Sequence, residues 1–488
     1  MKGVRSAAIL PALHHCLFLV LAFVLTLLVQ RSSILHSDEG YTLNAAWQLW
    51  NGMKMYDDFR LFVAPGGGYA VYWFWALTGG PSFLSARVLS LLLSWASIAA
   101  VYLILVRRGV RGVGLAVAVL AWVIASAQYV LLNHNPFSSY AACWLLLLLL
   151  RAQDRDASLG SGSLRRADHA LVGAAGGVVV LFLQTKGLVL IAATAAFTLF
   201  AGGGKRGLRA AGALAAGAAA VVAPLLLVWK PSVLVREWFV VPLTNNYLGQ
   251  TGGSRPLAIA CLLIAGAMAA IALRLRDRRL LAIAVVQGAL VVSGLNNTDA
   301  HHAGVNSFPL IVFVPLALQR RAARQPVADP APPPAKSPPA TVLMAIVVAA
   351  FAVLMATPAG RPLWKQSTLY FDFVRRVPRN LFPQPRVAAA RAIYAGPFMP
   401  GLYFALGKKN PYFVAESVVC DADCRRRLLA QVEATKPEIA FLDYDMIRHL
   451  HYDENNPLDA YFRDRYVACP PSEYEGVIVR AIDTGWCP

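Results

Sequence analysis

The sequence predicts a polytopic α-helical membrane protein with about eleven transmembrane helices and a small α/β domain at its C-terminal end. Hydrophobic residues make up 57% of the 488 residues and charged residues 15%, whereas a soluble domain carries about 25% charged residues. The apolar residues fall in long runs, and basic residues gather in alternate turns between those runs. These features are typical of a chain that crosses a membrane many times.

The first apolar run, 12–29, follows Lys2 and Arg5. No small-x-small cleavage site follows it and many more apolar runs do, so we expect a retained helix rather than a cleaved signal peptide. Ten further segments predict the remaining spans, several of them near the lower limit of about 17 residues: 82–106, 112–132, 136–150, 169–184, 187–203, 208–229, 256–273, 279–295, 304–319 and 340–357.

The turns between these segments alternate in charge. Twenty Lys and Arg residues lie in one set of turns, at 2–5, 107–111, 151–166, 205–209, 274–279 and 320–336. The other set contains Lys54, Arg60, Lys186, Lys230, Arg236 and Arg255. Because basic loops stay in the cytoplasm, the N-terminus is predicted to be cytoplasmic and the segment after Thr357 to be external. The net charge of +19 then reflects topology, and no nucleic-acid partner is expected.

Segment 66–80 is apolar but too short for an ordinary span, and counting it as one would place Arg107, Arg108 and Arg111 outside. Its aromatic residues between Tyr72 and Trp75 favour a juxtamembrane or re-entrant helix, and whether it spans the membrane is left open. The predicted organisation is a transmembrane module at 1–321 whose first external loop is 32–81, a Pro-rich cytoplasmic linker at 322–340, a last transmembrane helix at 341–357 and an external domain at 358–488.

The external domain is predicted to contain a helix at Ala422–Thr435 and strands at Glu438–Leu442 and Val477–Ile482. It also holds four cysteines, Cys420, Cys424, Cys469 and Cys487. Disulfides are favoured over a zinc site because this side of the membrane is oxidising, although the spacing does not determine the pairing. Cys16, Cys143 and Cys261 fall in membrane segments and are expected to act as small hydrophobic residues.

Polar side chains collect in the turns that are predicted to be external. The first external loop contains Asp38, Glu39, Tyr41, Lys54 and Asp58, and a helix is expected from about Glu39 to Gly52. The later turns and the start of the span after the first loop add Arg87, His134, Asn135, Lys186, Arg236, Glu237, His301 and His302. Because polar groups at a membrane edge are costly unless they have partners or line a site, their collection on one face predicts a functional site.

The first external loop resembles that of the GT-C glycosyltransferases, in the branch with protein O-mannosyltransferase-like, aminoarabinose-transferase-like and galacturonosyltransferase-like enzymes. The resemblance is carried by Asp38-Glu39-Gly40-Tyr41, Gly52, Tyr56-x-Asp58-Phe59, Pro65 and the aromatic segment leading to Ala86-Arg87. It implies a GT-C-like fold, a polyprenyl-phosphate sugar donor and a catalytic base at Asp38, with Glu39 beside it. The branch often has Lys-Pro-Pro at the end of this loop, where this chain has Ala64-Pro65-Gly66-Gly67, so Lys54 or Lys186 is expected to replace that lysine.

The chemistry expected of such an enzyme fits these residue types. A carboxylate can take the proton of an acceptor hydroxyl on the face opposite the leaving phosphate, which inverts the sugar centre. Lys186, Arg236 or the asparagines can stabilise the phosphate. Asp38, Glu39 and His302 do not make a complete divalent-cation site, so no metal ligands are assigned and metal dependence is left open.

Other interpretations compete at several of these positions. Asp38 is also suited to cap a helix, Asp58 to begin a turn, and Lys186 or Arg87 to anchor at the lipid interface. For the whole chain, the rivals are a flippase or transporter of lipid-linked substrates and a glycan polymerase or ligase, which would use arginines such as Arg236 and Arg255. The sugar and the lipid, glycan or protein acceptor are not determined. The composition, rich in Ala and Arg, favours a bacterial inner membrane with the external side in the periplasm.

Overall fold

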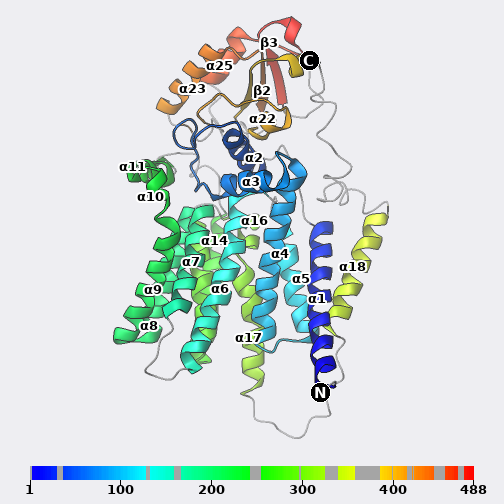
Figure 1. The fold of residues 1–488 in the computed structure, drawn as a ribbon, viewed down its shortest axis with the longest axis vertical. Helices are drawn as coiled ribbons and strands as arrows, with labels where there is room; N and C mark the ends of the chain where they lie inside the picture. The colour runs from blue at the N-terminus through cyan, green and yellow to red at the C-terminus, as the bar shows by residue number, and fades with distance from the viewer. Residues whose placement is uncertain are drawn as a thin grey trace.

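The computed structural model shows a helical bundle with a small α/β domain at one end (Figure 1). It describes residues 3–29, 37–127, 132–158, 166–241, 254–295, 298–324, 339–357, 385–397, 399–414, 420, 422–443, 457–470 and 477–487. Residues 325–338 of the predicted Pro-rich linker at 322–340 lie outside these residues.

Each of the eleven predicted apolar segments overlaps a helix of the bundle. The helices are α1 (Gly3–Val29), α4 (Phe83–Arg107), α5 (Gly112–Ala127), α6 (His134–Ser158), α7 (Arg166–Phe182), α8 (Gln184–Gly202), α9 (Gly204–Val222), α14 (Arg255–Arg274), α15 (Arg278–Ser293), α17 (Phe308–Ala322) and α18 (Ala340–Ala356). Four stretches of the described chain are helical, long and apolar enough to cross a membrane: Phe83–Arg107, Gln184–Gly202, Gly204–Val228 and Arg255–Arg274. Leu13–Val29, Gly112–Ala127 and Ala340–Leu354 are shorter apolar helices. The protein is therefore an integral membrane protein, and the count of eleven spans stays a prediction.

Small residues allow the closest helix packing in the bundle, between α7 and α9. A Cβ atom at Gly173 would lie 1.8 Å from the Leu214 carbonyl oxygen, and one at Gly217 would lie 1.9 Å from the Ala170 carbonyl oxygen. In a membrane, the hydrophobic effect does not drive two helices together, because lipid is as apolar as their side chains. Helices there associate through close van der Waals contact, which small residues such as glycine allow.

The N-terminus lies at one end of the bundle (Figure 1), and ion pairs join the helices at this end. Asp154 at the end of α6 pairs with Arg108 after α4, at 2.7 Å, and with Arg279 of α15, at 2.8 Å. Near them, Arg155 pairs with Asp168 of α7 at 2.5 Å. Turns predicted to lie on one side of the membrane thus lie together in space.

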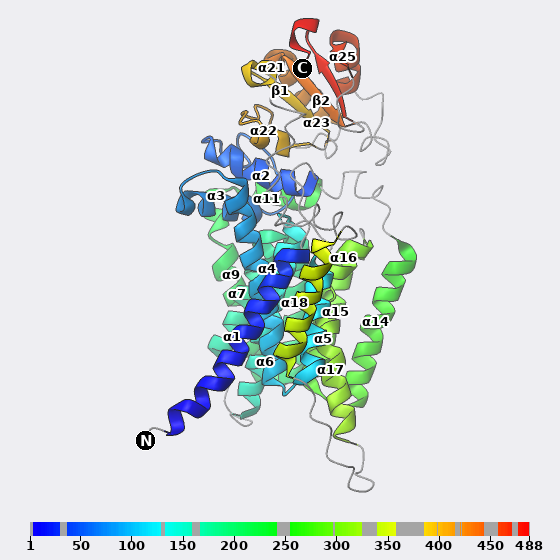
Figure 2. The same cartoon turned by 90° about the vertical axis from the view of Figure 1, so that its right-hand side faces the viewer.

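The opposite end of the bundle is covered by short helices that run across it (Figure 2). They are α2 (Ser37–Trp50) and α3 (Gly66–Thr78). The short elements α11 (Pro231–Val235), the π-helical turn η1 (Arg236–Val240) and α16 (Ala300–Val305) lie at the same end, and α10 (Leu225–Val228) continues the stretch of α9 toward it (Figure 1). The segment predicted as a juxtamembrane or re-entrant helix is α3. It begins after Pro65 and ends at Gly79, whose φ of 94° places it in the left-handed region that closes helices.

The C-terminal domain is a four-stranded sheet in the order β1-β2-β4-β3, with helices packed on it. β1 (Ile393–Gly396) pairs in parallel with β2 (Ile439–Asp443), and β4 (Val477–Ala481) runs antiparallel to β2 and to β3 (Val467–Ala468). The helices are α21 (Pro385–Ala389), α22 (Gly401–Ala405), α23 (Ala422–Thr435), α25 (Pro457–Arg465) and the 3₁₀ turn η5 (Thr484–Trp486). The core includes Tyr394, Phe441 and Phe462, each at most 4% exposed.

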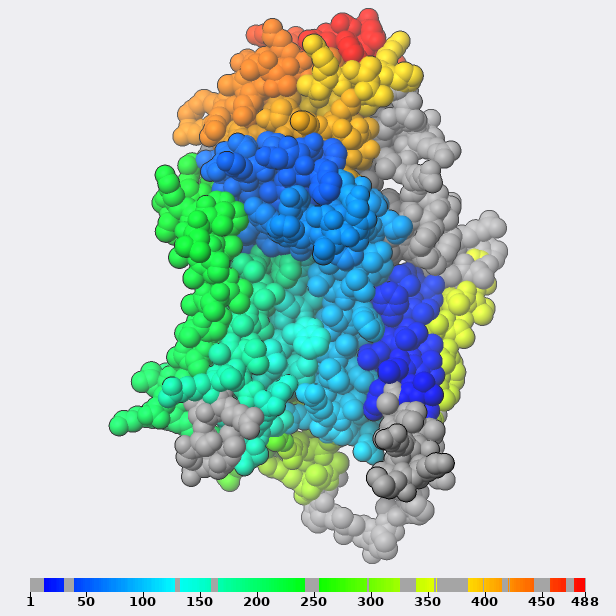
Figure 3. Space-filling view, in the orientation of Figure 1, coloured from blue at the N-terminus to red at the C-terminus, as the bar shows by residue number. Residues whose placement is uncertain are grey.

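The C-terminal domain rests on α2, α3 and the loop between them, so this segment lies between the domain and the bundle (Figure 3). The Trp47 indole donates to the Lys408 carbonyl at 2.7 Å, and the Trp75 and Phe404 rings stack at 5.1 Å. The Arg60 amide donates to the Phe413 carbonyl at 2.7 Å. These contacts join segment 37–81 to the C-terminal domain.

Candidate active site

The first turn of α2 contains Asp38 and Glu39. Helix α2 begins at Ser37, so Asp38 lies inside the first turn rather than before it; its side chain lies outside the described part of the structure. The Glu39 carboxylate forms a two-point ion pair with Arg87 of α4, with Nε to Oε1 and Nη2 to Oε2 both 3.1 Å. Both side chains are fully buried, and the Arg87 guanidinium lies 3.8 Å from the centroid of the Phe83 ring. Glu39 and Arg87 therefore fix the start of α2 against the bundle.

The loop after α2 is held by Gln184, the first residue of α8. Its side-chain oxygen accepts a hydrogen bond from the Ala64 amide at 2.9 Å, and its NH₂ group donates to the carbonyls of Phe62 and Trp238 at 3.2 and 3.0 Å. The Tyr41 hydroxyl accepts from the Phe62 amide at 3.1 Å. One buried amide thus joins the loop to the bundle and to η1.

Tyr56 lies in the same loop and has a φ of 68°. Residues other than glycine seldom adopt this left-handed backbone conformation, and those that do are often found at functional sites. Its hydroxyl accepts a hydrogen bond from the Trp238 indole at 2.8 Å and donates to the Val63 carbonyl at 3.2 Å. Burial raises the pKa of the Tyr56 hydroxyl, so it stays protonated at neutral pH. Its ring meets the Trp229 ring edge-on at 5.2 Å.

Of the remaining predicted residues near this loop, only Glu237 is buried, in η1, where it pairs with Arg60 at 3.4 Å. Burial raises the pKa of the Glu237 carboxyl, while Arg60 and then Arg236 lower it in part. Asp58 and Lys54 form a turn in which the Asp58 carboxylate accepts from the Lys54 amide at 2.7 Å. The Lys54, Asp58 and Arg236 side chains are exposed.

The other predicted residues meet where α6, α8 and α16 begin, in what we call the helix-end cluster: His134, Asn135, Lys186, Asp299 and His302. The Asn135 side-chain NH₂ donates to Nε2 of His134 and to Nε2 of His302, both at 3.2 Å. The Lys186 ammonium donates to the Asn135 carbonyl at 3.2 Å and to the Ser139 hydroxyl at 2.9 Å. Lys186 is only 2% exposed.

Lys186 has no carboxylate within ion-pair distance in the part of the chain that the structure describes. A buried ammonium without a counter-anion is costly, so Lys186 is a candidate for contact with an anion. His301 is exposed and lies beside His302 in α16. The cluster therefore brings together four of the predicted residues, His134, Asn135, Lys186 and His302, but not Arg236 or Lys54.

Asp299 belongs to this cluster although the sequence does not single it out. It precedes α16, and its carboxylate accepts from the His302 amide and from the His302 ring, both at 2.8 Å. Burial raises the pKa of Asp299, but the hydrogen bonds from His302 outweigh this effect and hold the pKa below its ordinary value. An Asp three residues before a His at a helix start is the one sequence signal that points to it.

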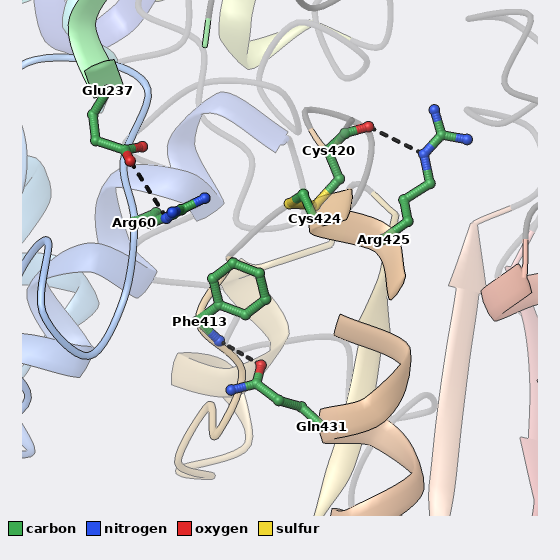
Figure 4. The surroundings of a disulfide bond; sticks show 7 residues. All are labelled: Arg60, Glu237, Phe413, Cys420, Cys424, Arg425 and Gln431. Atoms are coloured by element: carbon green, nitrogen blue, oxygen red, sulfur yellow. Dashed lines mark hydrogen bonds and ion pairs between the residues drawn. A yellow bond between two sulfur atoms is a disulfide. The ribbon is translucent and has the colours of Figure 1, made fainter. Parts of the chain in front are cut away.

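Both disulfides lie in the C-terminal domain, Cys420–Cys424 and Cys469–Cys487, which confirms the disulfide prediction and supplies the pairing. The Cys420–Cys424 disulfide joins a residue that precedes α23 to the first turn of that helix, near the first loop (Figure 4). There, the guanidinium groups of Arg60 and Arg427 lie 5.4 and 4.4 Å from the Phe413 ring centroid, and the Gln431 side chain accepts from the Phe413 amide at 3.1 Å. Within the described chain, no three His, Cys, Asp or Glu side chains are placed to hold a metal ion.

No protein-family model matches the sequence, and neither does any curated protein. Among solved structures, the chain is similar to ArnT from Cupriavidus metallidurans bound to undecaprenyl phosphate. The two are 17% identical, with a TM-score of 0.60 over 98% of each chain. The apo state of the same protein matches over 99% of each chain, with 16% identity and a TM-score of 0.57. The chain thus has the fold of ArnT over nearly its whole length, in agreement with the fold that the resemblance predicts.

Proposed function

We propose that this chain is a membrane glycosyltransferase that moves a sugar from a polyprenyl-phosphate donor to an extracytoplasmic lipid, glycan or protein acceptor. The observation that carries the proposal is the match of fold over the whole chain to ArnT, a protein that was solved with undecaprenyl phosphate bound. The collection of polar and charged residues at the end of the bundle beneath the C-terminal domain supports it independently.

Asp38 is the proposed catalytic base. It is in the first turn of α2, directly before Glu39, and the Glu39–Arg87 ion pair anchors that turn to α4. A carboxylate held in this way can remove the proton of an acceptor hydroxyl as that oxygen attacks the anomeric carbon, and the sugar leaves its phosphate with inversion. Because Glu39 is engaged by Arg87 on both oxygens, we assign the proton transfer to Asp38 and the anchoring of its turn to Glu39.

The leaving phosphate is proposed to face the helix-end cluster. When the bond between the anomeric carbon and the phosphate oxygen breaks, the electron pair stays on the phosphate and its negative charge grows. The Lys186 ammonium is buried beside the Asn135 backbone carbonyl, so it can stabilise the charge of the phosphate through a medium of low polarity. Lys186 thus takes the part that the missing Lys-Pro-Pro lysine plays in the related branch. Tyr41, Lys54, Asp58, Arg236, Glu237 and His301 stay proposed substrate contacts or supports of the loop.

The acceptor side is proposed to be the periplasm of a bacterium, with eleven spans in the inner membrane. The N-terminus and the ion-paired basic turns lie at one end of the bundle, and the candidate site and the C-terminal domain lie at the other. The positive-inside rule assigns the first end to the cytoplasm.

Mass spectrometry of envelope glycolipids and glycoproteins tests this function in a deletion strain complemented with wild type, Asp38→Asn or Asp57→Asn. Asp57 is an exposed carboxylate of the same loop and is the matched control. We expect one sugar mass to disappear in the deletion and in Asp38→Asn, with accumulation of the lipid-linked donor, and to return with wild type and Asp57→Asn. Full restoration by Asp38→Asn would assign the base to another residue. An unchanged sugar pattern in the deletion strain would reject transferase activity and favour a transport role.

A further inference from the structure

Ser139 is the one side chain among the described residues that accepts a hydrogen bond from the Lys186 ammonium. Its hydroxyl oxygen lies 2.9 Å from Nζ of Lys186, and the side chain is fully buried. The other acceptor is the Asn135 backbone carbonyl at 3.2 Å, which also accepts from the Ser138 hydroxyl at 2.7 Å. Because an ammonium has three N–H donors, one donor of Lys186 is left without an acceptor in the part of the chain that the structure describes.

The Ser139 hydroxyl also donates a hydrogen bond, to the side-chain oxygen of Asn306 at 3.1 Å. A hydroxyl has one hydrogen and two lone pairs. Because Asn306 takes the hydrogen, both lone pairs are left to accept, and one of them accepts from Lys186. Asn306 is 6% exposed and caps the end of α16. Helix α6, helix α8 and the end of α16 are therefore joined through these three side chains.

Gln287 of α15 fixes the backbone of Asn306. Its NH₂ group donates to the Asn306 carbonyl at 3.2 Å, and its side-chain oxygen accepts from the Leu310 amide, also at 3.2 Å. Gln287 is 6% exposed. These two contacts bridge the end of α16 and the first turn of α17, so the Asn306 side chain extends from a backbone that is held in place.

Without Asn306, the hydrogen of the Ser139 hydroxyl would need another acceptor. A serine inside a helix can donate to the carbonyl four residues earlier, and for Ser139 that carbonyl belongs to Asn135, the second acceptor of Lys186. The hydroxyl would then compete with the ammonium for the same oxygen. Asn306 therefore keeps both acceptors available to Lys186.

We propose that Asn306 is a positioning residue for the phosphate of the lipid carrier, acting through Ser139 on Lys186. By taking the Ser139 hydrogen, Asn306 keeps two acceptors on the ammonium, and the third N–H and the charge are left for the phosphate. The inference rests on the proposed function and deepens it, because it names the side chains that orient the cation. Neither Asn306 nor Ser139 carries a charge or transfers a proton in this scheme.

The affinity of the purified full-length protein in detergent for two lipids tests this role: undecaprenyl phosphate, and undecaprenol, which has the same chain without the phosphate. Asn306→Leu is similar in shape and removes the acceptor, Asn306→Ala is the smaller alternative should the leucine not fold, and Ser139→Ala removes the hydroxyl. Each is made in the wild-type chain and in Lys186→Met, and the melting temperature is recorded for every protein. Ser126→Ala is the matched control, since this buried serine of α5 donates to a carbonyl of its own helix.

We expect Asn306→Leu and Ser139→Ala each to weaken binding of undecaprenyl phosphate about tenfold, the loss of roughly one hydrogen bond to a charged group, and to leave binding of undecaprenol unchanged. Because Asn306 acts through Ser139, the double variant should bind as weakly as either single variant and no more weakly. In Lys186→Met, which lacks the cation, the same substitutions should leave the affinity for undecaprenyl phosphate unchanged. Ser126→Ala should bind both lipids as wild type does.

The outcomes that overturn the inference differ from those that overturn the proposed function. Equal losses for both lipids, or an equal loss in the wild-type chain and in Lys186→Met, would mean that Asn306 only packs the helices together. Wild-type affinity in the Asn306 variants would mean that Asn306 does not orient Lys186. In each of these cases the proposed transferase function stands. If wild type binds undecaprenyl phosphate no more tightly than undecaprenol, the proposed contact with the phosphate fails together with the positioning role.

Discussion

Glu39 and Arg87 are fully buried, and two hydrogen bonds join the Arg87 guanidinium to the Glu39 carboxylate. Removing one partner of such a pair leaves an uncompensated charge in the interior. We therefore expect Arg87→Met to lower the free energy of unfolding by about 3 kcal/mol. Glu39→Gln combined with Arg87→Met should recover much of that loss, because neither side chain then carries a charge. Thermal and denaturant unfolding in detergent measures both effects.

The exposed pair Arg463 and Asp464 is the control for this experiment, and its removal should leave stability unchanged because surface ion pairs contribute little. The same variants test the roles assigned to Asp38 and Glu39 in the first turn of α2. Because the anchoring role acts through the position of Asp38, Glu39→Gln with Arg87→Met should slow sugar transfer while the lipid-linked donor still binds, and a wild-type rate would mean that the Glu39–Arg87 pair does not position Asp38.

At the scale of single residues, the sequence identifies the candidates but not their partners. Asn135 and His302 are 167 positions apart, and Lys186 lies 51 positions from Asn135, so no local pattern joins them. Asp58 and Lys54 are a different case: both were predicted as substrate contacts, and their hydrogen bond shows that Asp58 also has the turn-forming role that the sequence offered as the alternative. Side-chain pairing across the bundle depends on helix order and rotation, which one sequence does not encode in any short motif.

Helix α3, which follows the loop after α2, packs closely against α7 at Gly66. A Cβ atom at Gly66 would lie 2.4 Å from the Leu181 carbonyl oxygen of α7, whereas one at Gly67 would lie 3.5 Å from a methyl group of Thr42. We expect Gly66→Ala to displace α3 and the preceding loop and to reduce activity strongly, and Gly67→Ala to be tolerated. Complementation of the deletion strain and melting temperature measure the two variants side by side. Equal behaviour of both would mean that α3 does not need this close approach.

At the scale of elements, periodicity and length predict most of the helices, and short elements are missed. The helix at Ala422–Thr435 is confirmed at both ends, and the two predicted strands of the C-terminal domain correspond to β2 and β4 within one residue. β1 and β3 are missed because four and two residues are too few for an alternation pattern to appear. They exist because neighbouring strands supply their hydrogen bonds, which is information from the tertiary structure.

At the scale of the whole molecule, the charge pattern and the three-dimensional arrangement agree with each other. The turns rich in arginine, predicted to share one side, are joined by ion pairs at the end opposite the C-terminal domain. A chain with its sides reversed would have to carry these basic turns across the membrane during insertion, which the positive-inside rule disfavours. The same arrangement places the candidate site between the bundle and a domain whose disulfides need an oxidising compartment.

This orientation predicts the labelling of two engineered cysteines by a membrane-impermeant maleimide. Asp464→Cys lies on the exposed surface of the C-terminal domain, and Lys205→Cys lies on the exposed start of α9 at the other end of the bundle. In intact spheroplasts, Asp464→Cys should react and Lys205→Cys should not, until detergent opens the membrane. Wild type, which has Cys16, Cys143 and Cys261 as free thiols, gives the background. Labelling of Lys205→Cys alone in intact cells would place the candidate site on the cytoplasmic side, where the lipid-linked sugars of the periplasm could not reach Asp38 or Lys186.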